Sequence, residues 1–120
     1  MVRGAQIRIR EVMEKLPGIA IAPHRFGGIE FLLGKREVGH LHGDELIDIP
    51  FPMNVRNDLV AANKASPHHI LPKSGWVSIF LRSSQDVDRG IELLKLSFEL
   101  ARSRKAGPSS EITGRTGASR

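Results

Sequence analysis

Three short runs near the N-terminus decide the fold: IAIAPHRF (19–26), GGIEFLLG (27–34) and REVGHLHG (36–43). Each run is apolar or alternates apolar with polar residues, and glycine-containing turns separate them, as is typical of antiparallel strands joined by hairpins. A fourth run, LIDIPF (46–51), extends the pattern until Pro50 and Pro52, because proline cannot donate a hydrogen bond to an inner strand. These residues predict an antiparallel sheet.

The run WVSIFL (76–81) is the most strand-like in the chain. Side chains alternate along a strand, so Trp76, Ser78 and Phe80 share one face of it. We expect this strand to join the sheet after an intervening helix.

Three helices are expected around these strands. Apolar residues at helical spacing form a stripe on the first, Asn54 can cap a second that reaches Lys64, and Ser83 or Ser84 caps the last. The inward-facing residues are expected to be Ile9, Val12, Met13 and Leu16, then Val55, Leu59 and Ala62, then Val87, Ile91, Leu94, Phe98 and Ala101. The order α-β-β-β-(β)-α-β-α predicts a two-layer α+β domain, with a single antiparallel sheet and helices on one face.

Length and composition limit the possible classes of protein. The chain has 120 residues, enough for one domain, and it has no cysteine, which excludes disulfides, thiolate catalysis and cysteine-ligated zinc. No apolar run approaches the roughly 18 residues needed to span a membrane. The N-terminal stretch MVRGAQIRIREVMEKL carries charges where a signal peptide would be apolar. We therefore expect a soluble, cytoplasmic protein with no membrane partner.

The net charge of +5 lies mostly in the last residues. Residues 102–120 hold five basic side chains against Glu111, whereas residues 1–101 hold 13 basic and 12 acidic side chains. We expect 1–101 to form the domain and 102–120, rich in glycine, serine and arginine, to be a disordered basic tail. A nearly neutral domain disfavours nucleic acid as the partner, because phosphate binding usually needs a basic face.

Histidines provide the candidate chemistry, since four of the five lie within 30 residues. On a strand, His40 and His42 would project from one face about 7 Å apart, and His68 or His69 could approach from a loop. Such a set could hold a metal, with Asp44 as a further ligand or as a hydrogen-bond partner that orients one. Alternatively, one histidine is a general base and another a hydrogen-bond donor, or the residues form only a polar face.

Residues near these histidines are candidates for binding a ligand. Trp76, which follows Ser74 and Gly75, could provide a flat wall for an aromatic ring or anchor the core. Lys73 could bind an anion, and Phe51 could form a second wall. No phosphate-binding, zincin or nucleophile-elbow motif is present.

Three segments carry a family resemblance: GHLHGDELIDIPFP (39–52), PHHILPKSGWVSIFLRSSQDV (67–87) and IELLKLSFELA (91–101). Together they resemble small bacterial proteins of the luciferase family, or luciferase-domain proteins, which are related to fungal luciferase. That enzyme oxidises a hydroxylated pyrone with molecular oxygen and emits light. The resemblance implies no metal or organic cofactor, and it implies roles for His40, His42 and one of His68 or His69. We expect no counterpart of the membrane segment of fungal luciferase, and a shared domain does not transfer the substrate.

The segment SGWVSIFLRSSQDVDRGIELLKLSFELA (74–101) also resembles the end of MmcQ/YjbR-like domains, in which a Trp-led strand runs into a final helix. This second resemblance implies an α+β fold with an antiparallel sheet.

Three hypotheses about function follow from the sequence. In the first, the domain binds a small aromatic or enol-type ligand and oxidises it with oxygen and no cofactor. His40 or His42 would deprotonate the ligand, the other histidines would stabilise the anion, and Trp76 and Phe51 would enclose the ring. The second is a nucleic-acid- or protein-binding module that uses the sheet and the tail. The third is a metal protein with His40, His42 and His69 as ligands. The sequence leaves the oligomeric state open.

Overall fold

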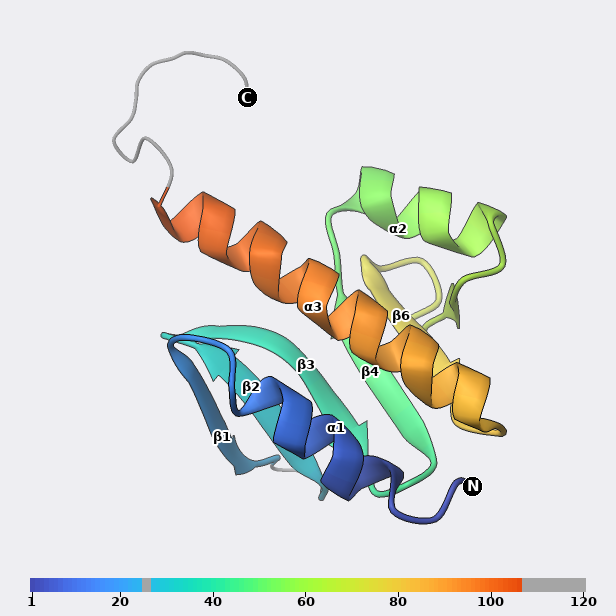
Figure 1. Cartoon of the computed structure of the whole chain (residues 1–120). Helices are drawn as coiled ribbons and strands as arrows, with labels where there is room; N and C mark the ends of the chain where they lie inside the picture. The colour runs from blue at the N-terminus through green and yellow to red at the C-terminus, as the bar shows by residue number, and fades with distance from the viewer. Residues whose placement is uncertain (25–26, 107–120) are drawn as a thin grey trace.

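The computed structural model describes residues 1–24 and 27–106. Within them, the helices are α1 (Ala5–Met13), α2 (Met53–Ala61) and α3 (Ser84–Ala106), and the strands are β1 (Ile19–Pro23), β2 (Ile29–Leu33), β3 (Arg36–His42), β4 (Leu46–Pro50), β5 (Ser66–Pro67) and β6 (Trp76–Phe80). The six strands of this described part form one antiparallel sheet in the order β1-β2-β3-β4-β6-β5 (Figure 1). The predicted α+β class and antiparallel sheet are confirmed, and the short β5 is an addition.

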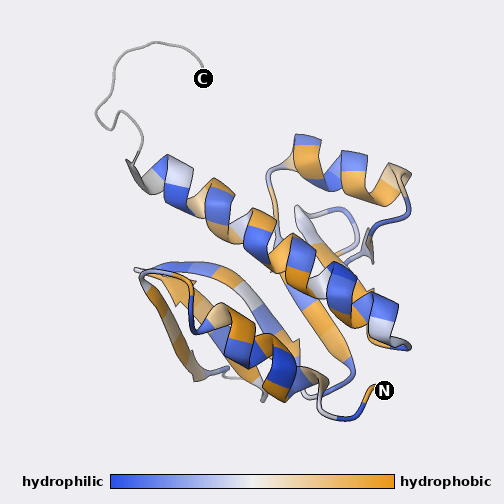
Figure 2. Ribbon diagram, viewed as in Figure 1, coloured by the Kyte–Doolittle hydropathy of each residue, from blue (hydrophilic) through white to orange (hydrophobic). Residues whose placement is uncertain are grey.

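One face of the sheet, here called the helix face, packs against α1 and α3 (Figure 1). Orange apolar and blue polar segments alternate along α3 and along the strands, as an element with one buried side requires (Figure 2). Two glycines allow α3 to lie close to the sheet. A Cβ at Gly39 would come within 2.5 Å of the Leu94 side chain, and one at Gly90 within 2.2 Å of Ile47. A larger residue at either position would require the Leu94 or Ile47 side chain, or the helix itself, to shift.

The opposite face, here called the histidine face, carries a row of polar residues across five strands. Directly paired positions give the sequence Glu30, His40, Asp48, Ser78 and Ser66, one each from β2, β3, β4, β6 and β5. Paired residues of antiparallel strands lie side by side on the same face. The register therefore brings residues that are far apart in the sequence into one line.

A bulge in β3 adds another acid to the histidine face. Phe31 pairs with Gly39 and Leu32 with Glu37, so Val38 is the extra residue. In a regular strand, residues three apart point to opposite faces. The bulge places Glu37 on the same face as His40, and the two side chains are in contact.

Three predicted helix boundaries were wrong. Helix α2 begins at Met53 after Pro52, so Asn54 lies inside this helix rather than capping it. Helix α2 ends at Ala61 rather than Lys64, and Ala62 is exposed rather than inward-facing. Asn63 takes a φ of 60°, a left-handed conformation that ends a helix. Helix α3 continues to Ala106, into the segment expected to be disordered, with Arg102 over the Phe98 ring. Residues 107–120, the rest of the expected tail, lie outside the described residues.

Among the helices of the described residues, none has the length and apolar character required to cross a membrane. A cytoplasmic location stays a prediction.

Candidate functional site

Four imidazoles converge on one carboxylate oxygen at the centre of the histidine face. The Nε2 atoms of His40, His42 and His69 lie 3.1, 3.0 and 3.0 Å from Oδ2 of Asp48, and Nε2 of His68 lies 3.4 Å from it. We call these four histidines and Asp48 the histidine cluster. It brings together all four residues that the sequence nominated as catalytic.

Strand register and one loop build this cluster. His40 and His42 lie two apart on β3, and Asp48 pairs directly with His40 from β4. His68 and His69 follow β5 at the start of the loop that leads to β6. The backbone N–H of His69 donates to Oγ of Ser78 over 3.2 Å. This hydrogen bond attaches the loop to the histidine face.

Asp48 is held as a carboxylate at the centre of the cluster. Its side chain is 1% exposed, and the Ser78 hydroxyl donates to Oδ1 at 2.7 Å. Burial raises the pKa of Asp48, but hydrogen bonds with His40, Ser78 and His69 outweigh it and hold that pKa well below its usual range. The cluster therefore has a buried negative charge at its centre.

His40 lies between two carboxylates. Its Nδ1 is 2.5 Å from Oε2 of Glu37, and its Nε2 faces Asp48. Burial lowers the pKa of His40, but the hydrogen bonds with Asp48 and Glu37 raise it to about 9. Because the Glu37 carboxylate only accepts, Nδ1 of His40 carries a proton, and Nε2 is the nitrogen that can lose one.

His68 has the opposite arrangement. Its Nδ1 accepts the backbone N–H groups of Ile70 and Leu71 at 3.2 and 2.9 Å. Burial lowers the pKa of His68, which favours the neutral ring. A neutral imidazole has one proton, so that proton lies on Nε2 and points toward Asp48.

Among the described residues, two groups around Asp48 have ligand atoms that all lie within 4.8 Å of one another: His40, His42 and Asp48, and Asp48, His68 and His69. Two ligands bound at about 2.1 Å to one ion and at right angles are about 3.0 Å apart. The contacts of His40 and His42 with Asp48 match this spacing. A third group, His24, Glu37 and His40, contains the 2.5 Å contact, which is too short for two ligands of one ion and fits a hydrogen bond.

Aromatic rings enclose the buried side of the cluster. The Trp76 ring lies 5.3 Å from the His40 ring and 6.0 Å from the His68 ring, and His24 stacks on His40 at 4.1 Å. The Trp76 ring thus borders the cluster, and its role as a wall for a ligand stays a prediction.

The family comparison matches this region. The family model of the Luciferase domain matches residues 35–97, more than half of the chain. The chain belongs to the Luciferase domain family. No curated protein and no solved structure matches it. The part that matches the Luciferase domain includes the whole histidine cluster, Glu37, Trp76 and Ser78, whereas His24 lies before it.

Other residues nominated from the sequence lie elsewhere in this Luciferase domain. The two carboxylate oxygens of Asp44 accept the backbone N–H groups of Gly4 and Gln6 at the start of α1. Ser74 closes a turn by donating to the Leu71 carbonyl, and Lys73 is exposed in the same loop.

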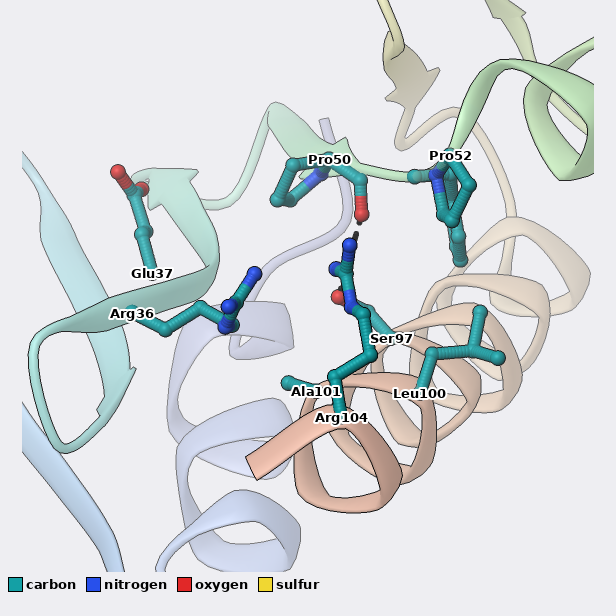
Figure 3. A pocket seen from close by; sticks show the side chains of 9 residues that line it. Arg36, Glu37, Pro50, Pro52, Ser97, Leu100, Ala101 and Arg104 are labelled. Carbon is teal, nitrogen blue, oxygen red and sulfur yellow. Dashed lines mark hydrogen bonds between the residues drawn. The ribbon is translucent and has the colours of Figure 1, made fainter. Parts of the chain in front are cut away.

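Phe51 is part of the core and lines a pocket of about 140 Å³ between the end of α3 and β3 (Figure 3). Arg36 and Arg104 also line this pocket, and Glu37, which contacts His40, lies at its edge (Figure 3). The pocket lies beside α3 on the helix face, whereas the Glu37 carboxylate points away from it toward His40, so the pocket and Phe51 are not part of the cluster (Figure 3).

Four residues of this region were not nominated from the sequence: Asp48, Glu37, Ser78 and His24. A carboxylate between two isoleucines in LIDIP was an available signal for Asp48, because a charged residue in an apolar strand needs a partner.

Proposed function

We propose that the histidine cluster binds one divalent transition-metal ion and uses it in the oxygen-dependent oxidation of a small enol- or phenol-type molecule. The observation that carries the proposal is the approach of four Nε2 atoms to one carboxylate oxygen. Membership of the Luciferase domain family supports the choice of oxidation and of this ligand class. The resemblance implied no cofactor, so the metal rests on geometry alone.

Hydrogen bonding to Asp48 accounts for the cluster only in part. A carboxylate oxygen offers two lone pairs, so Oδ2 can accept two well-directed N–H groups. Four nitrogens lie within 3.4 Å of it. A cation among the imidazoles binds the nitrogen lone pairs that have no N–H partner. Its positive charge also compensates the buried negative charge of Asp48.

The surroundings of His40 and Asp48 also fit a metal site. Metal-bound histidines usually donate their second ring N–H to a carboxylate, as Nδ1 of His40 does to Glu37. Ligating carboxylates are usually hydrogen-bonded, as Asp48 is by Ser78. Imidazoles with one carboxylate and no thiolate suit iron, manganese, copper or zinc.

A ligand can approach the cluster from one side. The side chains of His42 and His69 are 31% and 28% exposed, against 10% for His40 and 9% for His68. An enol or phenol entering there would place its oxygen near the ion, lose its proton to an imidazole, and be oxidised by molecular oxygen. The ion would stabilise the resulting oxyanion.

The test is metal content followed by oxygen uptake. The full chain, produced without a histidine tag, is expected to hold one equivalent of metal after incubation with iron(II) or zinc and removal of the excess. The His42→Ala variant should hold far less. Oxygen consumption with a panel of enols and phenols should occur only with the metal-loaded wild type. If the wild type binds no metal yet consumes oxygen with such a ligand, the metal-free hypothesis replaces this one.

A further inference from the structure

We infer that His40, His42 and Asp48 hold the ion, whereas His68 is a positioning residue that donates to Asp48 and is not a ligand. This inference rests on the proposed function and assigns separate roles within the cluster. It also replaces the set His40, His42 and His69 expected from the sequence.

The two candidate ligand groups around Asp48, one with His40 and one with His68, differ in whether Nδ1 of that histidine carries a proton. Nδ1 of His40 donates to Glu37, which leaves Nε2 able to bind a cation while the ring stays neutral. Nδ1 of His68 instead accepts two backbone N–H groups, from Ile70 and Leu71. An ion on Nε2 of His68 would require a fully deprotonated ring. The group that contains His68 is therefore unsuited to an ion.

His68 has a different task, which its two nitrogens define. Nε2–H points to Oδ2 of Asp48 at 3.4 Å, and Nδ1 fixes the backbone of residues 70 and 71. The side chain is 9% exposed, so little water competes for these contacts. His68 thereby connects the Asp48 carboxylate to the loop in which His68 itself lies. It also orients Oδ2 of Asp48, the oxygen that binds the ion.

Because His68 is not a ligand, coordination positions of the ion remain for other ligands. Two imidazoles and one carboxylate are the set found in non-haem iron(II) oxygenases, and they occupy three of the six positions of an octahedral ion. The remaining positions can hold molecular oxygen and one or two oxygen atoms of an anionic substrate. His69, which is exposed and 3.0 Å from Asp48, is placed to accept the substrate proton.

Nitrogen-resolved NMR of the histidine rings, with and without one equivalent of zinc as a diamagnetic probe, tests this assignment. We expect His68 to keep its proton on Nε2 in both states. We expect zinc to shift Nε2 of His40 and His42, with the proton of each ring on Nδ1. A zinc-bound Nε2 on His68, or a proton on its Nδ1, would overturn the inference. If zinc shifts no ring, the proposed function fails, whereas the spectrum without zinc still tests the donor role of His68.

Matched variants give a second readout. His68→Gln keeps a side-chain N–H donor and should weaken zinc binding by about 10–100-fold, the range for residues that orient a ligand. His68→Leu, which has no donor, should bind more weakly than His68→Gln. His42→Gln should lose more affinity than either. Equal losses in His68→Gln and His42→Gln, with both variants folded by circular dichroism, would contradict the division of roles.

Discussion

The two faces of the sheet use the same strands for opposite purposes. On β4, Ile47 and Ile49 are fully buried beneath the helices, whereas Asp48 between them meets four imidazoles. The helix face buries apolar area, which stabilises the fold. The histidine face buries a charge and polar rings, which stabilise only when fully paired. The helix face therefore contributes most of the stability, and the histidine face carries the binding role that we propose.

The largest expected effect is on the helix face. Phe98 is fully buried against the core, and Phe98→Ala should lower the free energy of unfolding by about 3–5 kcal/mol. Urea denaturation measures this loss, and zinc affinity of the folded variant should not change. Leu96, 36% exposed on the same helix, is the control. The comparison breaks if Phe98→Ala costs no more than Leu96→Ala.

On the histidine face, Asp48→Asn removes the central charge and keeps the shape of the side chain. We expect a loss of about 1–3 kcal/mol in the free energy of unfolding without metal, because buried N–H groups lose their acceptor. Zinc binding, followed by calorimetry, should be lost almost entirely. Zinc affinity equal to that of the wild type would contradict the assignment of Asp48 as a ligand.

The pKa of His40 gives the pH dependence of this face. This pKa is raised from 6.5 to about 9, so the protonated ring stabilises the fold without metal. The contribution is complete below pH 6.5 and is lost as the pH rises through about 9. Urea midpoints between pH 6 and pH 10 should therefore fall for the wild type and stay flatter for His40→Gln. Zinc binding at pH 7 should release about one proton, because Nε2 must be bare.

The smallest expected effect is that of replacing Asp44, which should change stability but not zinc affinity, unlike the replacement of Asp48. Asp44 accepts two N–H groups at the start of α1, so Asp44→Ala should cost about 0.5–2 kcal/mol in the free energy of unfolding. Its zinc affinity should match that of the wild type. A loss of zinc binding in this variant would return Asp44 to the site that the sequence proposed for it.

The site could be predicted from the sequence as far as local periodicity extends. The period of two placed His40 and His42 on one face, and both contact Asp48. The position of Asp48 beside the histidines depends on the pairing of β3 with β4, which no local sequence pattern predicts. Asp44 was chosen because it lies close to the histidines in the sequence, yet it lies in the turn between these strands.

Two further features of the site could be recognised only from the folded structure. Glu37 reaches His40 only through the bulge at Val38, which shifts the alternation by one residue. The different protonation of His40 and His68 depends on a neighbouring carboxylate in one case and on two loop amides in the other. The fold was easier to predict because periodicity and turn residues all indicated the same architecture.

Anomalous X-ray diffraction from zinc-loaded crystals of the full chain would show whether an ion binds at Asp48 and which atoms hold it. We expect a single strong peak about 2.1 Å from Nε2 of His40, Nε2 of His42 and Oδ2 of Asp48. A structure with no peak at Asp48, or with zinc bound only elsewhere, would contradict this assignment.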